Sequence, residues 1–328
     1  MEQCETKAIS KKREYLFDNY KALLIVLVVI SHLIEQNYKN NMYLYELKWA
    51  IVSFHMPAFI FISGYFSKKR YTMKKLVSGL VIPYFVYEVL YYLLYTLLLH
   101  KETKLYLDRP KFSLWYLIAL FAWRLVAPIV SKIPGHIYIS IIAGLLIGLC
   151  GLGNFLSIPR IVFFFPFFLA GRSFDSTRLK KYQNKKYRCL AVGIIVIGII
   201  FLFLDSGHRA LSTYIFYGRY SYAEMNMDCV SGICVRAACY AISFLLLFLV
   251  MLVIPTQEKR YSYYGQRTMP IYIFHGFVYS VLKFGTNILP SVHTNLQSVF
   301  LIIFCLFLVW LFARKPFVII TEKISHLI

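Results

Sequence analysis

The chain has 328 residues, of which 59% are hydrophobic and 16% are charged. This composition excludes an ordinary soluble globular protein and predicts a membrane protein. The formal net charge of +21 would suggest a nucleic-acid partner in a soluble protein, but here the Lys and Arg residues cluster between apolar runs, where they indicate membrane topology instead.

The apolar runs predict an all-α, polytopic transmembrane bundle of about ten spans, which forms a single domain over residues 1–328. Nine or eleven spans are alternatives, because the fifth and sixth runs are short and interrupted and are candidates for broken or re-entrant helices. No cleavable signal peptide is evident in the polar N-terminal segment. The predicted spans are 16–34, 43–66, 76–99, 112–131, 137–151, 160–172, 189–205, 230–254, 268–288 and 296–313.

The Lys and Arg residues predict that both termini are cytoplasmic, with residues 1–15 as a cytoplasmic segment. With the N-terminus inside, almost every basic cluster falls in a cytoplasmic loop, as the positive-inside rule requires. The main exception is the outer segment 101–111. The longest outer segment, 205–228, is rich in tyrosine and is either part of a binding surface for a hydroxylated substrate or an interfacial aromatic belt.

The first predicted span carries Lys21 and His32, with ten residues between them. Ionisable side chains inside a span are costly, so each is a functional candidate. A step of eleven residues is three helical turns and a rise of about 16 Å, so the two side chains share one helix face at different depths. Glu35, one turn after His32, either orients the imidazole or is a solvated charge at the end of the span, and the solvated charge is favoured.

The second predicted span carries His55 near its middle, close to Pro57 and to the small pair Ser63 and Gly64. The proline frees a backbone carbonyl one turn earlier, and the small pair allows another helix to approach closely. A functional His55 and a structural histidine bonded to a neighbour are equally supported.

The later spans carry further ionisable candidates. Glu88 and Arg124, in the third and fourth spans, either pair across helices or line an acceptor channel, and the ion pair is favoured. Arg160, at the outer start of the sixth span, is expected to snorkel to the membrane surface. His275, in the ninth span, is a second candidate for donor or proton handling.

The seven cysteines form no CxxC pair and have no histidine at metal-ligand spacing, so no metal site is predicted. Cys229 and Cys234 could form a bridge in an outer segment, but free thiols are favoured.

Several segments occur in a characteristic order along the chain. In the first span, Lys21 is followed after ten residues by His32. The second, third, fourth, sixth and ninth spans then carry, in this order, FHMPAFIFISGYF, LVIPYFVYE, LWYLIALF, FFFPFFLAGR and TMPIYIFHGF. In these segments, over nearly its whole length, the chain resembles the acyltransferase-3 family of integral membrane acyltransferases. It is most similar to the fucose acetylase-like branch.

The resemblance implies transfer of an acyl group, usually acetyl, from cytoplasmic acetyl-CoA to a hydroxyl of a cell-surface glycan or its lipid-linked precursor. It implies that Lys21 stabilises the anionic donor and that His32 is the catalytic imidazole, a suitable general base at neutral pH. Arg172, at the inner end of the sixth span, is a candidate contact for a CoA phosphate. No tightly bound cofactor is implied, and acetyl-CoA or another acyl-CoA is a co-substrate.

The chain departs from the family before the third span, where many members carry paired arginines and this chain has KKRYTMKK. Lysine lacks the bidentate fork of arginine. We therefore expect Arg70, Lys74 and Lys75 to anchor the chain at the membrane surface rather than to bind phosphate.

The sequence thus predicts an O-acyltransferase of the cell membrane. Its expected partners are acyl-CoA, a carbohydrate acceptor and the lipid bilayer, and no nucleic acid. The main alternative is a transporter or exporter of a glycan or small carboxylate, with His32, Glu88 and Arg124 as its pathway. A second alternative is a membrane module that recruits a separately encoded enzyme. Only the acyltransferase would release CoA as a free thiol.

Overall fold

The computed structural model describes residues 13–325, which form helices joined by short 3-10 and π-helical segments, without a β-strand in that range. The predicted all-α architecture is confirmed. The first helices are α1 Tyr15–Leu33, α2 Met42–Val52, α3 His55–Tyr65, α4 Met73–Leu76, α5 Ile82–Leu93, α6 Trp115–Val130, α7 His136–Leu146 and α8 Ile158–Ser173. The others are α9 Ser176–Leu179, α10 Lys185–Leu204, α11 Cys229–Val253, α12 Ser262–Gly265, α13 Thr268–Gly285, α14 Asn295–Phe312 and α15 Lys315–Ser325.

The protein is a helical membrane protein. Within the described residues, 7 helical stretches are long and apolar enough to cross a bilayer. The three other predicted spans are also helical: α6 and α7 are shorter apolar helices, and α13 has 18 residues. The long stretches are Tyr15–Gln36, Met42–Tyr65, Met73–Leu98, Phe155–Ser173, Lys185–Leu204, Cys229–Val253 and Asn295–Phe312.

The sixth predicted run is longer than the sequence suggested. Its helical stretch begins at Phe155, and α8 then runs without a break to Ser173. The interruption lies at the start of this stretch, where Leu156 and Ser157 have left-handed backbone angles, with φ of 45° and 55°. The fifth run, by contrast, forms the short helix α7, as predicted.

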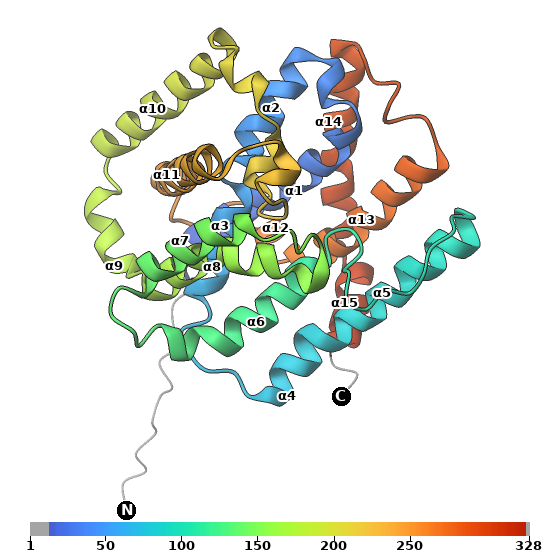
Figure 1. The fold of residues 1–328 in the computed structure, drawn as a ribbon, viewed down its shortest axis with the longest axis horizontal. Helices are drawn as coiled ribbons and strands as arrows, with labels where there is room; N and C mark the ends of the chain where they lie inside the picture. Colours follow the sequence, from blue (N-terminus) through green and yellow to red (C-terminus); the bar gives the residue numbers. More distant parts are fainter. Residues whose placement is uncertain (1–12, 326–328) are drawn as a thin grey trace, which may run out of the picture.

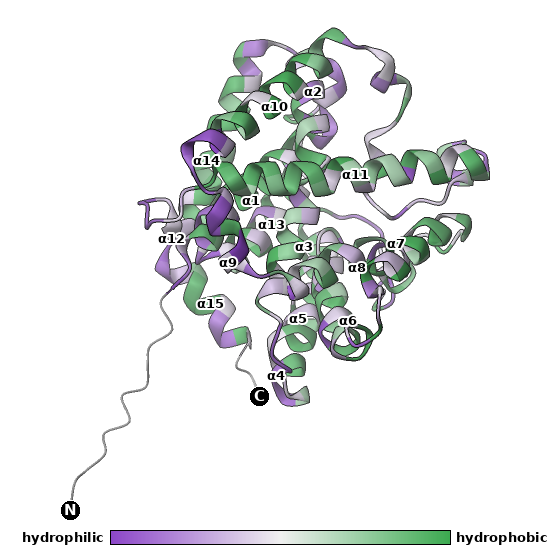
Figure 2. Ribbon diagram, turned by 90° about the vertical axis from the view of Figure 1, so that its left-hand side faces the viewer, coloured by the Kyte–Doolittle hydropathy of each residue, from purple (hydrophilic) through white to green (hydrophobic). Residues whose placement is uncertain are grey.

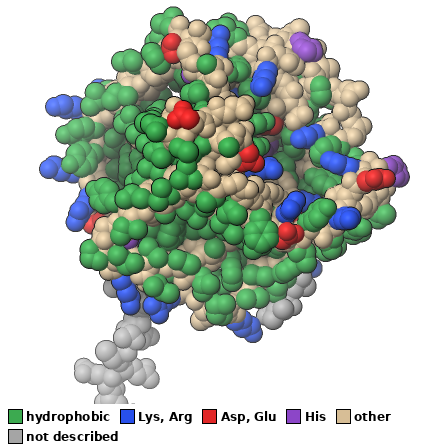
Figure 3. All heavy atoms as spheres, viewed as in Figure 1, with side chains coloured by type: hydrophobic (Ala, Val, Ile, Leu, Met, Phe, Trp, Pro, Cys, Tyr) green, Lys and Arg blue, Asp and Glu red, His purple; other side chains and the backbone are tan. Residues whose placement is uncertain are grey.

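Helix α1 runs through the middle of the bundle, packed against α2, α3, α12, α13 and α14 (Figure 1). In the membrane-spanning part of the α1 stretch, 72% of the residues are buried inside the protein, whereas in the peripheral helix α10 the share is 6%. Figure 2 shows α10 and α11 as largely hydrophobic ribbons, and apolar side chains cover much of the face in Figure 3. Lipid is the natural partner of such a surface. Functional polar groups are therefore expected around the enclosed helix α1.

The second span is broken between α2 and α3, and the break places His55. Pro57 has no backbone N–H, so the carbonyl of Ser53 loses its helical partner. The hydroxyl of Ser243, from α11, donates to that carbonyl oxygen at 2.5 Å. The break is thus satisfied from a neighbouring helix, and His55 becomes the first residue of α3.

Helices α3 and α8 approach closely, as the small residues of the second span predicted. A Cβ added to Gly64 would overlap the carbonyl oxygen of Phe168, and one added to Gly171 would overlap that of Phe61. The backbones can touch only because both positions are glycine. This contact fixes the helix that carries Ser63 against the helix that carries Arg172.

Candidate active site

A cavity of about 210 Å³ surrounds His32 near the end of α1, and we call it the His32 cavity. Its polar lining comes from α1, α2, α3, α8 and α13, so it forms only when the bundle assembles. Phe216 and Tyr217, from the segment between α10 and α11, complete one wall. The acidic, basic and imidazole side chains that line it are His32, Glu35, Lys48, His55, Arg160 and Lys283.

The imidazole of His32 packs among rings. Its centroid lies 4.6 Å from Phe112, 5.4 Å from His275 and 6.1 Å from Tyr279. Within residues 13–325 neither ring nitrogen has a hydrogen-bond partner. The aromatic contacts hold the ring in the cavity wall, with both nitrogens unengaged by the described residues.

The two neighbouring imidazoles are bound differently. His55 and His275 each contact the carbonyl oxygen of the residue four positions earlier, through Nδ1 at 2.8 Å to Ile51 and 2.9 Å to Ile271. Because a carbonyl only accepts, Nδ1 carries the proton in both rings. His55 lines the cavity, whereas His275 is fully buried behind His32, with Nε2 unpaired in the described structure. His55 thus has a bond of the kind expected of a structural histidine, but its Nε2 has no hydrogen-bond partner among the described residues.

Glu35 is not the solvated charge that the sequence favoured. Its carboxylate forms an ion pair with Lys48, whose side chain is 1% exposed, and accepts a hydrogen bond from the Tyr217 hydroxyl at 2.9 Å. Lys48 also donates to the backbone oxygen of Ser31 at 2.7 Å. The described residues contain no bond from Glu35 to His32. Glu35 therefore does not orient the imidazole through a direct hydrogen bond.

The segment 205–228 folds over this end of α1. Burial and the nearby Glu35 carboxylate raise the pKa of Tyr217 well above its usual value, so its phenol stays a donor. A second buried carboxylate, Glu46 of α2, accepts from Arg209 at 2.7 Å and contacts His208 at 2.8 Å. These contacts fasten the segment to α2. An aromatic belt alone would not place Tyr217 in the cavity wall.

A different set of hollows lies at the Lys21 end of α1. A groove of about 700 Å³ is here called the basic groove, and its lining is Arg13, Glu14, Asp18, Lys21, Tyr65, Phe66, Lys68, Lys69, Arg70, Tyr71, Thr72 and Lys75. Its lining includes six cationic and two acidic side chains. Arg70 and Lys75, expected to be membrane anchors, are among them, whereas Lys74 is not. Asp18 holds Lys21 at 3.0 Å and Arg13 at 2.6 Å.

Between the two ends lies a mostly apolar cavity of about 290 Å³, the middle cavity. It shares Lys21 and Phe66 with the basic groove and Met56 with the His32 cavity. Ser63 and Arg124 line it as well. The three hollows therefore follow one another along α1, and the Met56 side chain stands between the last two.

The remaining candidates are held by local contacts. The Ser63 hydroxyl is 2.5 Å from the Tyr116 hydroxyl, in the wall of the middle cavity. Arg124 donates to the Ser67 hydroxyl at 3.2 Å and does not pair with Glu88. Arg172 donates to the backbone oxygen of Ser67 and lies outside the linings of these three hollows. Its expected contact with a CoA phosphate stays a prediction.

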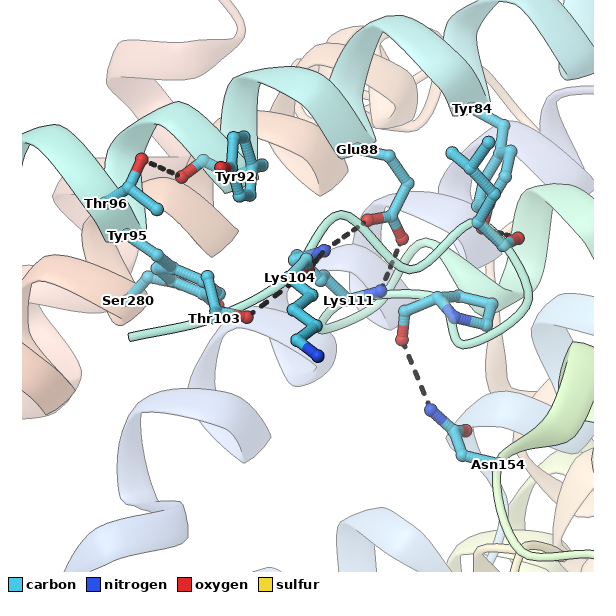
Figure 4. Close-up of polar contacts among 12 residues, drawn as sticks. Tyr84, Glu88, Tyr92, Tyr95, Thr96, Thr103, Lys104, Lys111, Asn154 and Ser280 are labelled. Carbon is cyan, nitrogen blue, oxygen red and sulfur yellow. Dashed lines mark hydrogen bonds and ion pairs between the residues drawn. The ribbon is translucent and has the colours of Figure 1, made fainter. Parts of the chain in front are cut away.

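Glu88 forms the favoured ion pair, with Lys111 in the segment before α6 (Figure 4). Its carboxylate accepts from the backbone N–H of Lys111 at 2.5 Å and from its ammonium group at 3.2 Å. The next residue is Phe112, which has a left-handed φ of 48° and packs on His32. Glu88 is therefore a positioning residue, because it fixes the segment that presents Phe112 to the imidazole.

Comparison with known proteins adds one decisive match. Residues 14–314 match the family model described as an acyltransferase domain, Acyl_transf_3. The chain belongs to the acyltransferase-3 family. Comparisons with curated proteins and with solved structures found no match.

An acyltransferase of this family needs a base for the acceptor and a hold on the donor. His32 is the imidazole in the cavity with both nitrogens unengaged among the described residues, so it suits the base. Lys21 reaches both the basic groove and the middle cavity, so it suits a charged donor. Lys48 and Tyr217 escaped the sequence analysis. The signal for Lys48 was a charged residue inside the second predicted span.

Proposed function

We propose that this membrane acyltransferase moves an acyl group, in the first instance acetyl, from acyl-CoA to a hydroxyl of a cell-surface polysaccharide or its lipid-linked precursor. We propose the cell membrane as its location. The observation that carries the proposal is the series of three hollows along α1, wide and basic at Lys21 and small at His32. Membership of the fucose acetylase-like branch stays a prediction.

The chemistry of the hollows suits the parts of an acyl-CoA. The basic groove, with its excess of cations, suits the phosphates of the nucleotide. The middle cavity is mostly apolar and suits the uncharged pantetheine arm. A donor laid out in this way would carry its thioester past Met56 toward His32. The rise of about 16 Å between Lys21 and His32 separates donor binding from the chemical step.

At the His32 end, the proposed step is a proton transfer coupled to acyl transfer. An imidazole nitrogen accepts the proton of the acceptor hydroxyl while the hydroxyl oxygen attacks the thioester carbonyl carbon. The carbon–sulfur bond then breaks, and the departing thiolate takes the proton from the imidazolium. Relay through an acyl-histidine would use the same imidazole as nucleophile.

Release of CoA thiol tests the proposal. Purified protein in lipid nanodiscs, given acetyl-CoA and a surface-polysaccharide extract, should release free thiol and acetylate the polysaccharide. The His32→Ala variant should be slower by about 10²–10⁴-fold, because the general base is lost. His293→Ala, at an exposed position before α14, is the matched control and should keep full activity.

Two results would count against the proposal. Full activity of His32→Ala would remove the catalytic assignment. Wild-type protein that neither binds CoA nor releases thiol would favour the transporter instead.

A further inference from the structure

The His32 cavity has more positive than negative charge in its wall. Lys48, Arg160 and Lys283 line it, and Glu35 is its only carboxylate within the described structure. The ion pair between Glu35 and Lys48 uses that carboxylate. Two positive charges, on Arg160 and Lys283, are therefore in excess.

Arg160, which the sequence predicted to snorkel, lines the His32 cavity. It lies in the first turn of α8, and its guanidinium sits 5.0 Å from the centre of the Trp115 ring and donates to Asn154 at 3.2 Å. No acidic residue of the described chain pairs with it. The positive end of the α8 dipole adds to its charge. The arginine thus faces the cavity without a counter-ion.

Lys283 lies on a different wall, in the last turn of α13. Its ammonium group is 5.6 Å from the centre of the Tyr279 ring and 5.2 Å from that of Phe284. Residues 13–325 offer it no carboxylate within ion-pair distance. Two cations without a carboxylate partner therefore line one cavity, and the cost of placing their charges there is offset when an anion binds in it.

The anion is not the nucleotide of the donor. If the proposed function holds, the CoA phosphates occupy the basic groove at the Lys21 end, about 16 Å of helix rise away. The thioester and an acetyl group, which would reach His32, carry no charge. The molecule left to bring a negative charge into the His32 cavity is the acceptor.

We propose that the acceptor carries an anionic group, a carboxylate or a phosphate, close to the hydroxyl that is acylated, and that Arg160 and Lys283 bind it. This inference rests on the proposed function and names the class of its acceptor: an acidic or phosphorylated saccharide. The guanidinium suits bidentate contact with either oxyanion, and the ammonium group supplies a second, movable charge.

Binding is the first test, because it does not depend on acyl transfer. The full chain is titrated with methyl glucuronide, glucose 1-phosphate and methyl glucoside, and dissociation constants are taken from the shift of the thermal unfolding midpoint. At least one anionic sugar should bind about tenfold more tightly than the neutral one. Equal affinity for the three sugars, including binding of none, would overturn the proposal.

Variants show whether these two cations carry the preference. Arg160→Gln and Lys283→Gln should each reduce the preference for the anionic sugar by about threefold or more, and Arg160→Lys should retain most of it. Lys132→Gln, at an exposed position after α6, is the matched control and should bind all three sugars as the wild type does. An undiminished preference in the Arg160→Gln/Lys283→Gln double variant would assign the anion to another site.

Turnover then separates the acceptor from the acyl group as the source of the charge. With acetyl-CoA, the wild type should acylate the anionic sugar faster than the neutral one, and the double variant should lose this advantage. If the double variant instead loses only a preference for succinyl-CoA over acetyl-CoA, the charge belongs to the acyl group and the proposal is wrong. Charge-selective binding without thiol release from any substrate pair would sink acyl transfer but leave the anion site standing.

Discussion

The two ends of α1 hold their charges in different ways. At the Lys21 end the groove is wide, about 700 Å³, and the Lys21 side chain is 20% exposed beside Asp18. At the His32 end the cavity is about 210 Å³, and the Lys48 side chain is 1% exposed beside Glu35. Both ends use a lysine and a carboxylate, but the lysine is the exposed partner at the Lys21 end and the buried partner at the His32 end, where the Glu35 side chain is 20% exposed.

This difference separates two tasks. A partly exposed lysine exchanges partners at little cost, which suits a groove where a large anion arrives and leaves. A buried lysine depends strongly on the groups around it, which suits a cavity whose walls must keep reacting groups in place. We therefore expect substitutions at the His32 end to change folding and the chemical step, and substitutions at the Lys21 end to change donor affinity.

Removing the charge of Lys48 should have the largest effect on stability. Lys48→Met keeps the length of the side chain but leaves the partly buried Glu35 carboxylate without its cation, so unfolding should become easier by about 1–3 kcal/mol. Thermal or denaturant unfolding of the purified variant in detergent measures this. Lys39→Met, at an exposed position on the same side of the bundle, should change stability by no more than about 0.5 kcal/mol.

A double variant tests the cause. If the loss comes from an unpaired carboxylate, Glu35→Gln combined with Lys48→Met should recover much of it. A double variant as unstable as Lys48→Met would mean that Lys48 acts through the Ser31 backbone oxygen, where it donates at 2.7 Å.

Blocking the junction between the middle cavity and the His32 cavity should have the next largest effect, this time on acyl transfer. Met56 lines both the middle cavity and the His32 cavity, so Met56→Trp should keep the thioester away from His32. Acyl transfer should fall by about 100-fold while CoA still binds in the basic groove. Met56→Leu, of similar volume, should stay close to the wild type in both assays. Loss of CoA affinity in Met56→Trp would mean that donor binding and chemistry are not separated along α1.

The placement of Lys21 and His32 on one face of α1 could be predicted because helix periodicity is a local property. Eleven residues make three turns whatever surrounds the helix. The break at Pro57 and the close approach at Gly64 were predictable for the same reason, since each follows from the chemistry of one residue. For Glu88, an ion pair was predicted, but its partner Lys111 lies in a connecting segment rather than across helices.

The residues that shape the His32 cavity could not be found in this way. Tyr217 is 182 positions from Glu35, and hydrophobic periodicity says nothing about how a polar segment folds back over a bundle. The sequence places Arg160 at the end of a span, and this position does not distinguish an arginine that snorkels to the membrane surface from one that lines a cavity. Only the packing of α8 against the cavity decides which way it points.

The smallest predicted effect is at the Lys21 end. Lys21→Gln removes one cation from a groove with six, and Arg13 still pairs with Asp18, so folding should be little changed. The KM for acetyl-CoA should rise about tenfold with kcat unchanged, because a charge-assisted contact to the donor is lost while the chemistry is not touched. The effect should shrink at high ionic strength, since this groove is open to solvent.

Lys74→Gln is the matched control for Lys21→Gln, because Lys74 lies beside the groove in sequence but is not part of its lining. Its KM for acetyl-CoA should stay at the wild-type value. A fall in kcat at constant KM in Lys21→Gln would instead mean that Lys21 acts at the reacting atoms. Across about 16 Å of helix rise, that would require the donor to lie with its phosphates, not its thioester, toward His32.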